Sequence, residues 1–421
     1  MAGRWLILAD DLTGAADCAI AFGRRGLAAA VTWGEIAGAG AATAGDHQHP
    51  VLSYDAASRG LTAEAAARRH ADVLQQLMEP DRLLFKKIDS TLRGQPASET
   101  AAALAHLKAQ SGSAFGIFAP AFPATNRTTV DGRVVVGGRP LEEAEVWKRD
   151  HTYDTADIAD VLASAGVRSE KVLLATIRGG DLKAHLARIA SGDSVVAICD
   201  AETEHDLHLI AEASLKISPA TLFIGSAGLA HALAALDDTS AAEKLEIPTS
   251  IYGTLIVVGS LAGASRSAAR KLVASGTVAH LPVTPEVLLG DKAGQAALAA
   301  RVTEGLTAGG DVLVEIVMDD NPKMSLGPQL AQNLADALMP VASSIGAFAA
   351  TGGETAAALL SRFGVNGIRL ADEIEPGVSL GLTLGALSVP IATKAGAFGD
   401  ENSLIKIRER LHTVRTQGSF T

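Results

Sequence analysis

Residues 5 to 17 read Trp5-Leu-Ile-Leu-Ala-Asp-Asp-Leu-Thr-Gly-Ala-Ala-Asp17, an apolar run that leads directly into two adjacent aspartates. This order predicts a buried strand near Leu6 to Ala9 that ends in a polar turn. In open α/β sheets, ligands bind outside the carboxyl ends of the strands. The side chains of Asp10, Asp11 and Thr13 are therefore candidate functional groups.

A structural role for the same turn stays open. Asp and Thr are both good N-cap residues, so Asp11 or Thr13 could simply cap a helix that runs from about Thr13 to Arg25. A cap needs only one such side chain, however, and the turn supplies three. We therefore interpret the turn as a candidate site whose partners lie elsewhere in the chain.

The size and composition of the chain exclude several classes of function. Its 421 residues predict two to three domains, and 36 basic against 47 acidic residues give a net charge of −11. This balance argues against nucleic acid as the main partner, because binding phosphates requires a basic surface. The two cysteines, Cys18 and Cys199, lack CxxC spacing, so we expect neither a disulfide framework nor a zinc site.

The same composition bears on where the protein works. The N-terminus lacks a charged segment followed by an apolar one, and the sequence has no run of about 18 apolar residues, so we expect neither secretion nor membrane spanning. The expected location is the cytoplasm. A homo-oligomer is compatible with the sequence.

Short apolar runs alternate with longer Ala-rich amphipathic runs, which indicates repeated βα units around a mostly parallel sheet. We predict an α/β fold with two domains, each a mostly parallel sheet flanked by helices. The apolar periodicity lapses around Asp237 to Ile251, which divides an N-terminal domain (1–240) from a C-terminal domain (250–421). In the first domain, Asp131-Gly132 between β-forming residues predicts a small hairpin over Thr129 to Val136.

The predicted strands follow from the apolar runs. In the first half they lie near Leu6 to Ala9, Val51 to Tyr54, Leu83 to Lys86, Phe115 to Ala119, Val172 to Ala175, Val195 to Cys199 and Thr221 to Ile224. In the second half they lie near Leu255 to Val258, Val312 to Val317, Ala347 to Ala350 and Val389 to Thr393. Helices are expected between them.

A second polar turn follows the strand in Leu83-Leu-Phe-Lys-Lys-Ile-Asp-Ser-Thr-Leu-Arg-Gly94. Its candidate residues are Lys86, Lys87, Asp89, Ser90, Thr91 and Arg93. Consecutive residues of a strand point to opposite faces, so at most one of the two lysines faces a given pocket. Cationic groups beside hydroxyls suit a small anionic substrate, and Arg93 could bind a carboxylate bidentately. The structural alternative is a solvated strand end before a helix that starts near Pro96.

A third strand end carries Ala119-Pro-Ala-Phe-Pro-Ala-Thr-Asn-Arg-Thr-Thr129. It offers Asn126, Arg127 and Thr128, and its prolines stiffen the loop. For each of these residues a structural role and a substrate contact are equally open. We predict that Asn126 and Arg127 bind substrate.

The second half has three strand ends that carry glycines. They are Val258-Gly-Ser260, Ala349-Ala-Thr-Gly-Gly-Glu-Thr-Ala356 and Lys394-Ala-Gly-Ala-Phe-Gly-Asp400. Glycines let phosphate oxygens approach the backbone, and free amides at a helix start favour anions. The Walker A pattern is absent, but three such turns in one domain predict a nucleotide site. Glu354 and Asp400 could hold Mg²⁺ through water, although either could instead cap a helix.

On these motifs the chain resembles the four-carbon acid sugar kinases, which phosphorylate 3-oxo-tetronate, D-threonate or D-erythronate with ATP. The resemblance covers nearly the full length and is carried by Ala9-Asp-Asp-Leu-Thr-Gly-Ala15, Lys86-Lys-Ile-Asp-Ser-Thr-Leu-Arg-Gly94, Ala119-Pro-Ala-Phe-Pro123 with Arg127-Thr-Thr129, Thr351-Gly-Gly-Glu-Thr355 and Lys394-Ala-Gly-Ala-Phe-Gly-Asp400. It implies that the N-terminal domain binds the sugar acid and the C-terminal domain binds ATP. The ATP contacts that it implies are Ser260, Gly352, Gly353, Glu354, Thr355, and Gly396 or Gly399.

Some residues depart from the family pattern. Ala16 and Gln95 stand where Asn is common, Leu261 and Ala262 replace small polar residues, and Trp147 to Tyr153 differs from the usual sequence after the hairpin. Ala16 and Gln95 flank the expected substrate pocket. The departures therefore leave the identity of the acid sugar open more than the reaction.

The expected reaction is transfer of the γ-phosphoryl group of ATP to a terminal hydroxyl of a small sugar acid. Asp10 or Asp11 would orient or deprotonate that hydroxyl, with Asp89 as a rival base. The acid sugar would be bound by Thr13, Lys86, Lys87, Ser90, Thr91, Arg93, Asn126 and Arg127, and Mg²⁺ would bridge the phosphates. Two alternatives are a sugar-acid dehydrogenase, whose GxGxxG fingerprint neither half contains, and a non-catalytic sugar-acid or nucleotide sensor.

Overall fold

The computed structural model describes residues 3–34, 49–192, 195–218, 220–236, 245, 247–318, 326–396 and 398–420. These residues form two compact units. Unit 1 contains residues 3–29 and the described residues from Trp33 to 236, and unit 2 contains Ala30–Thr32 and the described residues from Leu245 onward. Much of the predicted boundary around Asp237 to Ile251 lies outside the described residues, so the domain limits stay a prediction.

Unit 1 is built on a parallel sheet with the strand order β3-β1-β4-β11-β5-β10-β9. Its strands are β1 (Arg4–Ala9), β3 (Val51–Asp55), β4 (Arg82–Lys87), β5 (Phe115–Ala119), β9 (Arg168–Val172), β10 (Val195–Cys199) and β11 (Thr221–Gly225). Because all these strands run the same way, their carboxyl ends lie along one edge of the sheet.

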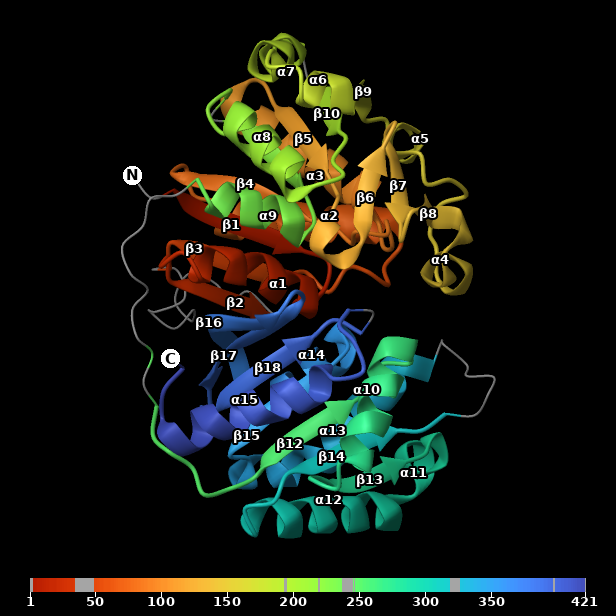
Figure 1. Cartoon of the computed structure of the whole chain (residues 1–421), viewed down its shortest axis with the longest axis vertical. Coiled ribbons are helices and arrows are strands. Elements are labelled where there is room, and N and C mark those ends of the chain that lie inside the picture. The colour runs from red at the N-terminus through yellow and green to blue at the C-terminus, as the bar shows by residue number, and fades with distance from the viewer. Residues whose placement is uncertain are drawn as a thin grey trace. The chain divides into compact units, whose positions relative to one another are not determined.

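Two layers of helices flank this sheet (Figure 1). One layer contains α1 (Leu12–Gly23), α8 (Glu204–Ser214) and α9 (Ala227–Ala234), and the other contains α2 (Ala63–Leu77), α3 (Pro96–Ser111) and α5 (Ile158–Ala163). The remaining helical elements of unit 1 are η2 (Pro123–Thr125), η3 (Leu141–Glu143), α4 (Glu145–Arg149), α6 (Leu174–Ile177) and α7 (Leu182–Ala190). Helix α3 starts with Pro96 at its first turn, as the sequence predicts.

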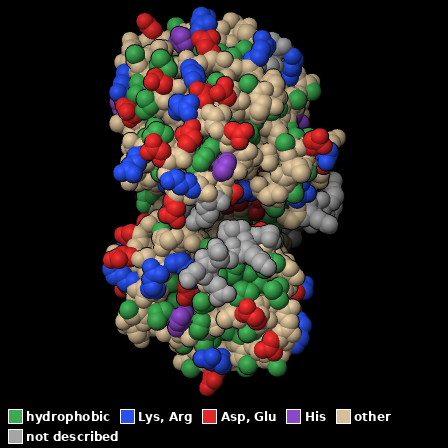
Figure 2. Space-filling model, turned by 90° about the vertical axis from the view of Figure 1, so that its right-hand side faces the viewer, with side chains coloured by type: hydrophobic (Ala, Val, Ile, Leu, Met, Phe, Trp, Pro, Cys, Tyr) green, Lys and Arg blue, Asp and Glu red, His purple; other side chains and the backbone are tan. Residues whose placement is uncertain are grey.

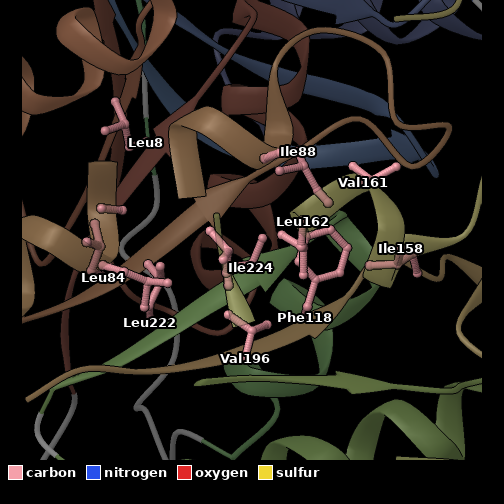
Figure 3. Packing of buried hydrophobic residues seen from close by; sticks show 14 of the residues in the cluster. Leu8, Leu84, Ile88, Phe118, Ile158, Val161, Leu162, Val196, Leu222 and Ile224 are labelled. Carbon is pink, nitrogen blue, oxygen red and sulfur yellow. The ribbon is translucent and has the colours of Figure 1, made fainter. Parts of the chain in front are cut away.

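Alternation along β1 determines which side chains meet each helix layer. Leu6 and Leu8 belong to the hydrophobic cluster formed with α2, α3 and α5, part of which Figure 3 shows. Trp5 points the other way, and its ring centroid lies 4.9 Å from that of Phe22 on α1. Each fully buried side chain of this size contributes roughly 1.5–3 kcal/mol. The packed sheet therefore gives the turns at its carboxyl edge a rigid base.

The predicted hairpin is confirmed. Strands β6 (Arg127–Val130) and β7 (Arg133–Val136) pair antiparallel, and β8 (Arg139–Pro140) extends this small sheet. Asp131 and Gly132 have φ angles of 53° and 70°, as a type I′ turn requires. The carboxylate of Asp200 accepts hydrogen bonds from both of their backbone amides, each at 2.9 Å, and so fastens the turn to the end of β10.

Unit 2 has a parallel sheet in the order β13-β14-β12-β15-β18, continued by antiparallel strands. The parallel strands are β12 (Thr254–Val258), β13 (Ala279–Val283), β14 (Val312–Ile316), β15 (Ala347–Thr351) and β18 (Pro390–Lys394). Beyond β18, the strands β17 (Val378–Gly385) and β16 (Val365–Glu375) form a hairpin, and Ala30–Thr32 of β2 (Ala29–Trp33) pairs with β16.

The helices of unit 2 cover its sheet. They are α10 (Gly263–Ala274), α11 (Pro285–Gly290), α12 (Lys292–Thr307), α13 (Gly327–Leu338), η5 (Met339–Ser344), α14 (Gly353–Arg362) and α15 (Ser403–Gln417). Leu272 of α10 and Leu404 of α15 pack with Ile256, Ala349 and Ala392 from the three central strands. This cluster supports the ends of β12, β15 and β18 from one face.

The α/β class with parallel sheets is confirmed, one predicted strand needs correction, and one hairpin was not predicted. A strand over Val172 to Ala175 is wrong, because β9 ends at Val172 and α6 begins at Leu174. A short apolar run fits either element, and its period cannot separate them. The antiparallel hairpin β16–β17 was not predicted, because charged residues such as Asp372 and Glu373 interrupt the apolar pattern of β16.

The described surface matches the acidic but mixed composition. Acidic and basic side chains are interspersed over the face that Figure 2 shows. In the described part of the chain, no helix combines the length and apolar character that crossing a membrane would need.

Candidate active site

The carboxyl ends of β1, β3 and β4 lie side by side in unit 1. Ala9, the last residue of β1, is in register with Asp55 of β3 and with Lys87 of β4. The turns that follow these three strands therefore start at one level of the sheet. Two of them are the charged turns identified from the sequence, after Ala9 and after Lys87.

Asp10 is buried and bound at two points by Arg59, which follows β3. Arg59 Nε donates to Asp10 Oδ2 at 2.7 Å and Nη2 donates to Oδ1 at 3.0 Å, while Nη1 donates to Asp11 Oδ2 at 2.7 Å. Burial alone would raise the pKa of Asp10, but the charges of Arg59 and Lys86 outweigh it and lower the pKa. Asp10 is therefore an anion at neutral pH.

Asp11 has the structural role that the sequence left open. Its Oδ1 accepts a hydrogen bond from the Gly14 amide at 2.9 Å, which makes it the N-cap of α1, and Thr13 Oγ1 donates to its Oδ2 at 2.9 Å. Asp10 takes no part in this cap. The two adjacent carboxylates are therefore distinguished by their contacts: Asp11 caps the helix, whereas both oxygens of Asp10 face Arg59.

The two lysines at the end of β4 point to opposite faces, as predicted. Lys86 is fully buried on the α3 side, where its Nζ lies 2.8 Å from Glu99 Oε2. Lys87 lies on the α1 side, where a Cβ added to Gly14 would be 2.9 Å from its Nζ. Only Lys87 therefore lies beside the capped start of α1.

The turn after β4 is organised around Asp89. Arg93 Nε and Nη2 donate to Asp89 Oδ2 and Oδ1, both at 2.9 Å, and the Thr91 hydroxyl also donates to Oδ2. Burial alone would raise the pKa of Asp89, but Arg93 holds it well below its usual range. Leu92 has a φ of 60°, which is strained for a bulky residue, and a Cβ added to Gly94 would lie 3.1 Å from Asp10 Oδ2. The turn after β4 therefore packs closely against the Asp10 carboxylate.

The other predicted residues of unit 1 take different places. Ser90 is buried in the turn after β4. Arg127 is also buried, and its Nη1 donates to the Thr125 carbonyl at 3.1 Å. Asn126 is exposed, has a φ of 57°, and accepts a hydrogen bond from the Gly137 amide through its carbonyl at 2.8 Å. The contacts of Asn126 are therefore those of a turn residue.

The charged cluster around the carboxyl ends of β1, β3 and β4 contains three residues that were missed from the sequence: Asp55, Arg59 and Glu99. The first two belong to Val51-Leu-Ser-Tyr-Asp-Ala-Ala-Ser-Arg59, a strand that runs into polar residues just as β1 does, so the same argument could have found them. Glu99 lies on α3 and accepts a hydrogen bond from Ser58 Oγ at 2.6 Å. A glutamate in the first turn of a helix carries no signal of such a contact.

Asp55 gives the cluster a measurable pH dependence. The residue is 2% exposed, and burial together with the charge of Asp11 raises the pKa of its carboxyl to about 7 from an ordinary 3.8. Between these two values the folded protein binds more protons than the unfolded chain. Stability contributed by protonated Asp55 is therefore present at low pH and lost as the pH rises to about 7.

We expect Asp55→Asn to remove this loss of folding stability with rising pH. Urea unfolding of both proteins at about pH 5 and about pH 8 should show the wild type losing on the order of 2 to 3 kcal/mol more than the variant. His70, whose pKa burial lowers to about 4, contributes a slope of opposite sign, which cancels because both proteins contain it. Equal pH dependence in the two proteins would contradict the raised pKa.

In unit 2 the three glycine-bearing turns come together. A Cβ added to Gly352 would lie 3.6 Å from Ser260 Cβ, and one added to Gly396 would overlap Ser260 Oγ. A Cβ added to Gly259 would overlap the side chain of Thr355, which is buried at the start of α14. Close approach at Gly259 and Gly396 therefore depends on glycine, whereas Gly352 is in ordinary contact with Ser260.

The remaining predicted residues of unit 2 lie around these turns. Gly353 opens α14 and Glu354 is exposed in its first turn. Gly399 lies beside Glu375 and Lys394, and Asp400 Oδ1 accepts from the Asn402 amide at 2.7 Å. Among the described residues, no group of three or more His, Cys, Asp or Glu side chains is placed to hold a metal ion.

Comparison with known proteins identifies both halves of the chain. A model of a sugar-binding N-terminal domain matches residues 5–233, and a model of a nucleotide-binding C-terminal domain matches residues 255–404. A D-threonate kinase from Cupriavidus necator is 41% identical over 95% of this chain and 96% of its own. The chain belongs to the four-carbon acid sugar kinase family. The resemblance inferred from the motifs is thereby confirmed.

A second curated relative supports the family assignment, and a solved structure shows the same fold. A D-threonate kinase from Bordetella bronchiseptica is 33% identical over 97% of this chain and 98% of its own. A crystal structure of a Haemophilus influenzae protein matches with a TM-score of 0.70 at 20% identity, covering 96% of this chain and all of that one. The latter likeness shows that the fold is shared.

Proposed function

We propose that this chain is an ATP-dependent kinase that phosphorylates the terminal hydroxyl of a four-carbon acid sugar, with D-threonate as the expected substrate. The observation that carries the choice of substrate is the 41% identity to a D-threonate kinase over 95% of the chain. The charged turns of unit 1 support a small acid as ligand, because cations and anions alternate around Asp10 there.

Asp10 is the group that orients or deprotonates the accepting hydroxyl. Phosphoryl transfer requires in-line positioning and a residue that holds the nucleophile. Asp10 is ionised, is not needed for the helix cap, and is aimed by its two hydrogen bonds from Arg59. Asp89 is less suited to act as a base, because its carboxylate accepts from the Thr91 amide and hydroxyl in addition to Arg93, whereas Arg59 alone among the described residues donates to the Asp10 carboxylate.

Arg93 and Lys87 bind the carboxylate of the acid sugar. Nε and Nη2 of Arg93 donate hydrogen bonds to Asp89, whereas none of the described residues accepts a hydrogen bond from Nη1. The outer edge of the guanidinium is thus left for a second carboxylate. Lys86 is paired with Glu99 in the core, so Lys87 is the lysine better placed to contact the substrate.

The nucleotide binds in unit 2, at Ser260, the amides from Gly352 to Thr355, and the turn that contains Gly396 and Gly399. The free amides at the start of α14 support binding of phosphate oxygens there. Mg²⁺ usually binds through one or two carboxylates together with the substrate phosphates, so a preformed cluster of ligands is not required. Glu354 is the carboxylate that would hold it, and the ion would neutralise phosphate charge.

A coupled assay for ADP release tests this proposal. The purified protein is incubated with ATP, Mg²⁺ and D-threonate, D-erythronate or 3-oxo-tetronate in turn, and we expect the fastest ADP release with D-threonate. Saturable binding of these acids without ADP release would support a sensor. Reduction of a nicotinamide cofactor in their presence would support a dehydrogenase. Either result overturns the proposal.

A further inference from the structure

Lys394, the last residue of β18, has no role in the function proposed above. Its ammonium group nevertheless contacts the turn after β18, one of the three glycine-bearing turns proposed to bind the nucleotide and here called the nucleotide turns. The side chain is fully buried. Burying an ammonium group costs several kcal/mol of hydration free energy. Its hydrogen bonds and the charges around it must offset this cost. The partners of Lys394 therefore indicate what it does.

The ammonium group of Lys394 holds the turn formed by Ala395 and Gly396, here called the Gly396 turn. Lys394 Nζ donates to Ser265 Oγ and to the Ala395 carbonyl, both at 3.2 Å. Ser265 Oγ in turn donates to the Gly396 carbonyl at 2.9 Å. The relay thus runs from the end of β18 through the first turn of α10 and back to the Gly396 turn.

The Gly396 turn is held against Ser260 by the same relay. No Cβ would fit at Gly396 without overlapping Ser260 Oγ, so even a small displacement of this turn changes the contact. Ser260 Oγ also accepts a hydrogen bond from the Ala262 amide at 3.2 Å, just before α10. The position of Gly396 therefore depends on a hydrogen-bond relay whose two side chains, Lys394 and Ser265, are both fully buried.

The surroundings of Lys394 are polar on the side of the nucleotide turns. Thr351 is in register with it on β15, so both side chains point to the same face. The Thr351 hydroxyl is buried and has no hydrogen-bond partner among the described residues. Burial lowers the pKa of Lys394 to about 8, and the charge of Glu375 acts to raise it.

We propose that Lys394 is a positioning residue of the nucleotide site, which holds the Gly396 turn through Ser265 so that the backbone of this turn can bind ATP phosphates. This inference rests on the proposed function, because it assumes that the nucleotide binds at these turns. It assigns a role to two side chains, those of Lys394 and Ser265, that do not touch the nucleotide themselves.

The test compares Lys394→Met and Ser265→Ala with Ser275→Ala. Ser275 lies at the other end of α10 and donates only within its own turn, to the Leu272 carbonyl at 2.6 Å, apart from a contact with Thr277, so it is a matched control. We expect the dissociation constant of MgADP, measured by calorimetry, and the KM for ATP to rise about three- to tenfold in the first two variants. The KM for the acid sugar should stay within about twofold, and Ser275→Ala should resemble the wild type.

The outcomes separate the inference from the proposed function. Wild-type protein that binds no MgADP refutes the proposed function. Wild-type protein that binds MgADP, with a Ser265→Ala variant that binds it equally well, overturns the inference alone. A purely structural role would lower the melting temperature and leave nucleotide affinity unchanged in the folded variants. If Lys394→Met does not fold, Ser265→Ala decides, because it breaks the same relay while leaving the Lys394 side chain and its bond to the Ala395 carbonyl in place.

Discussion

Asp10→Asn is expected to lower kcat by about 100- to 10,000-fold, the range that general-base assistance contributes. Asn preserves the shape of the side chain and can still accept a hydrogen bond from Arg59, but it carries no charge and cannot take a proton. The weakened contact with Arg59 should cost about 1.5–3 kcal/mol of unfolding free energy, as for hydrogen bonds to charged groups. Steady-state kinetics and urea unfolding of the same preparation measure both effects.

Asp11→Asn is the matched control, because the two aspartates are adjacent and both contact Arg59. Asn is as good an N-cap as Asp, so the bond from the Gly14 amide should persist and stability should change little. We expect a kcat within about tenfold of the wild type. If Asp10→Asn also keeps a near-normal kcat, the turn after β1 is structural and Asp89 becomes the leading candidate for the base.

The strand ends were predictable because their signal is local. An apolar run that stops at Asp10, or at Lys86 and Lys87, indicates both where the strand ends and which polar groups lie at its end. The parallel order of the sheet then brings such ends to one edge. The opposite directions of the two lysines followed from the period of a strand alone. The hairpin turn at Asp131 and Gly132 was equally local.

The missed contacts depend on parts of the chain that are distant in sequence. Arg59 binds Asp10 from 49 residues away, and Ser58 binds Glu99 from 41 residues away. The period of the sequence does not indicate such pairs, because the first depends on β3 lying beside β1 and the second on α3 lying beside the turn that follows β3. For the same reason the sequence could offer Asp10, Asp11 and Asp89 only as rivals. Their hydrogen-bond partners distinguish the three: Asp11 caps a helix and Asp89 is bound by Arg93, whereas Asp10 is bound by Arg59 and is the proposed catalytic carboxylate.

Arg93→Lys is expected to raise the KM for the acid sugar by about 10- to 100-fold while the KM for ATP changes little. Lysine keeps the positive charge but has no planar fork, so it cannot hold Asp89 with one edge and the substrate carboxylate with the other. Hydrogen bonds between charged groups contribute about 1.5 to 3 kcal/mol, and each 1.4 kcal/mol is a factor of about ten in affinity. Kinetics with each substrate varied in turn measure the two KM values.

Arg178→Lys separates loss of the substrate contact from loss of the internal pair. Arg178 binds Asp206 through Nε and Nη2, both at 2.8 Å, in the same edge-on arrangement that Arg93 uses for Asp89. Asp206 lies on α8, which follows β10 rather than β1, β3 or β4, so this variant should lose a comparable ion pair with no change in either KM. An unchanged KM for the acid in Arg93→Lys would remove Arg93 from the substrate site. A rise in both variants would show that the effect comes from loosening unit 1, because Arg178 shares the internal ion pair but lies away from the strand ends that carry the proposed substrate contacts.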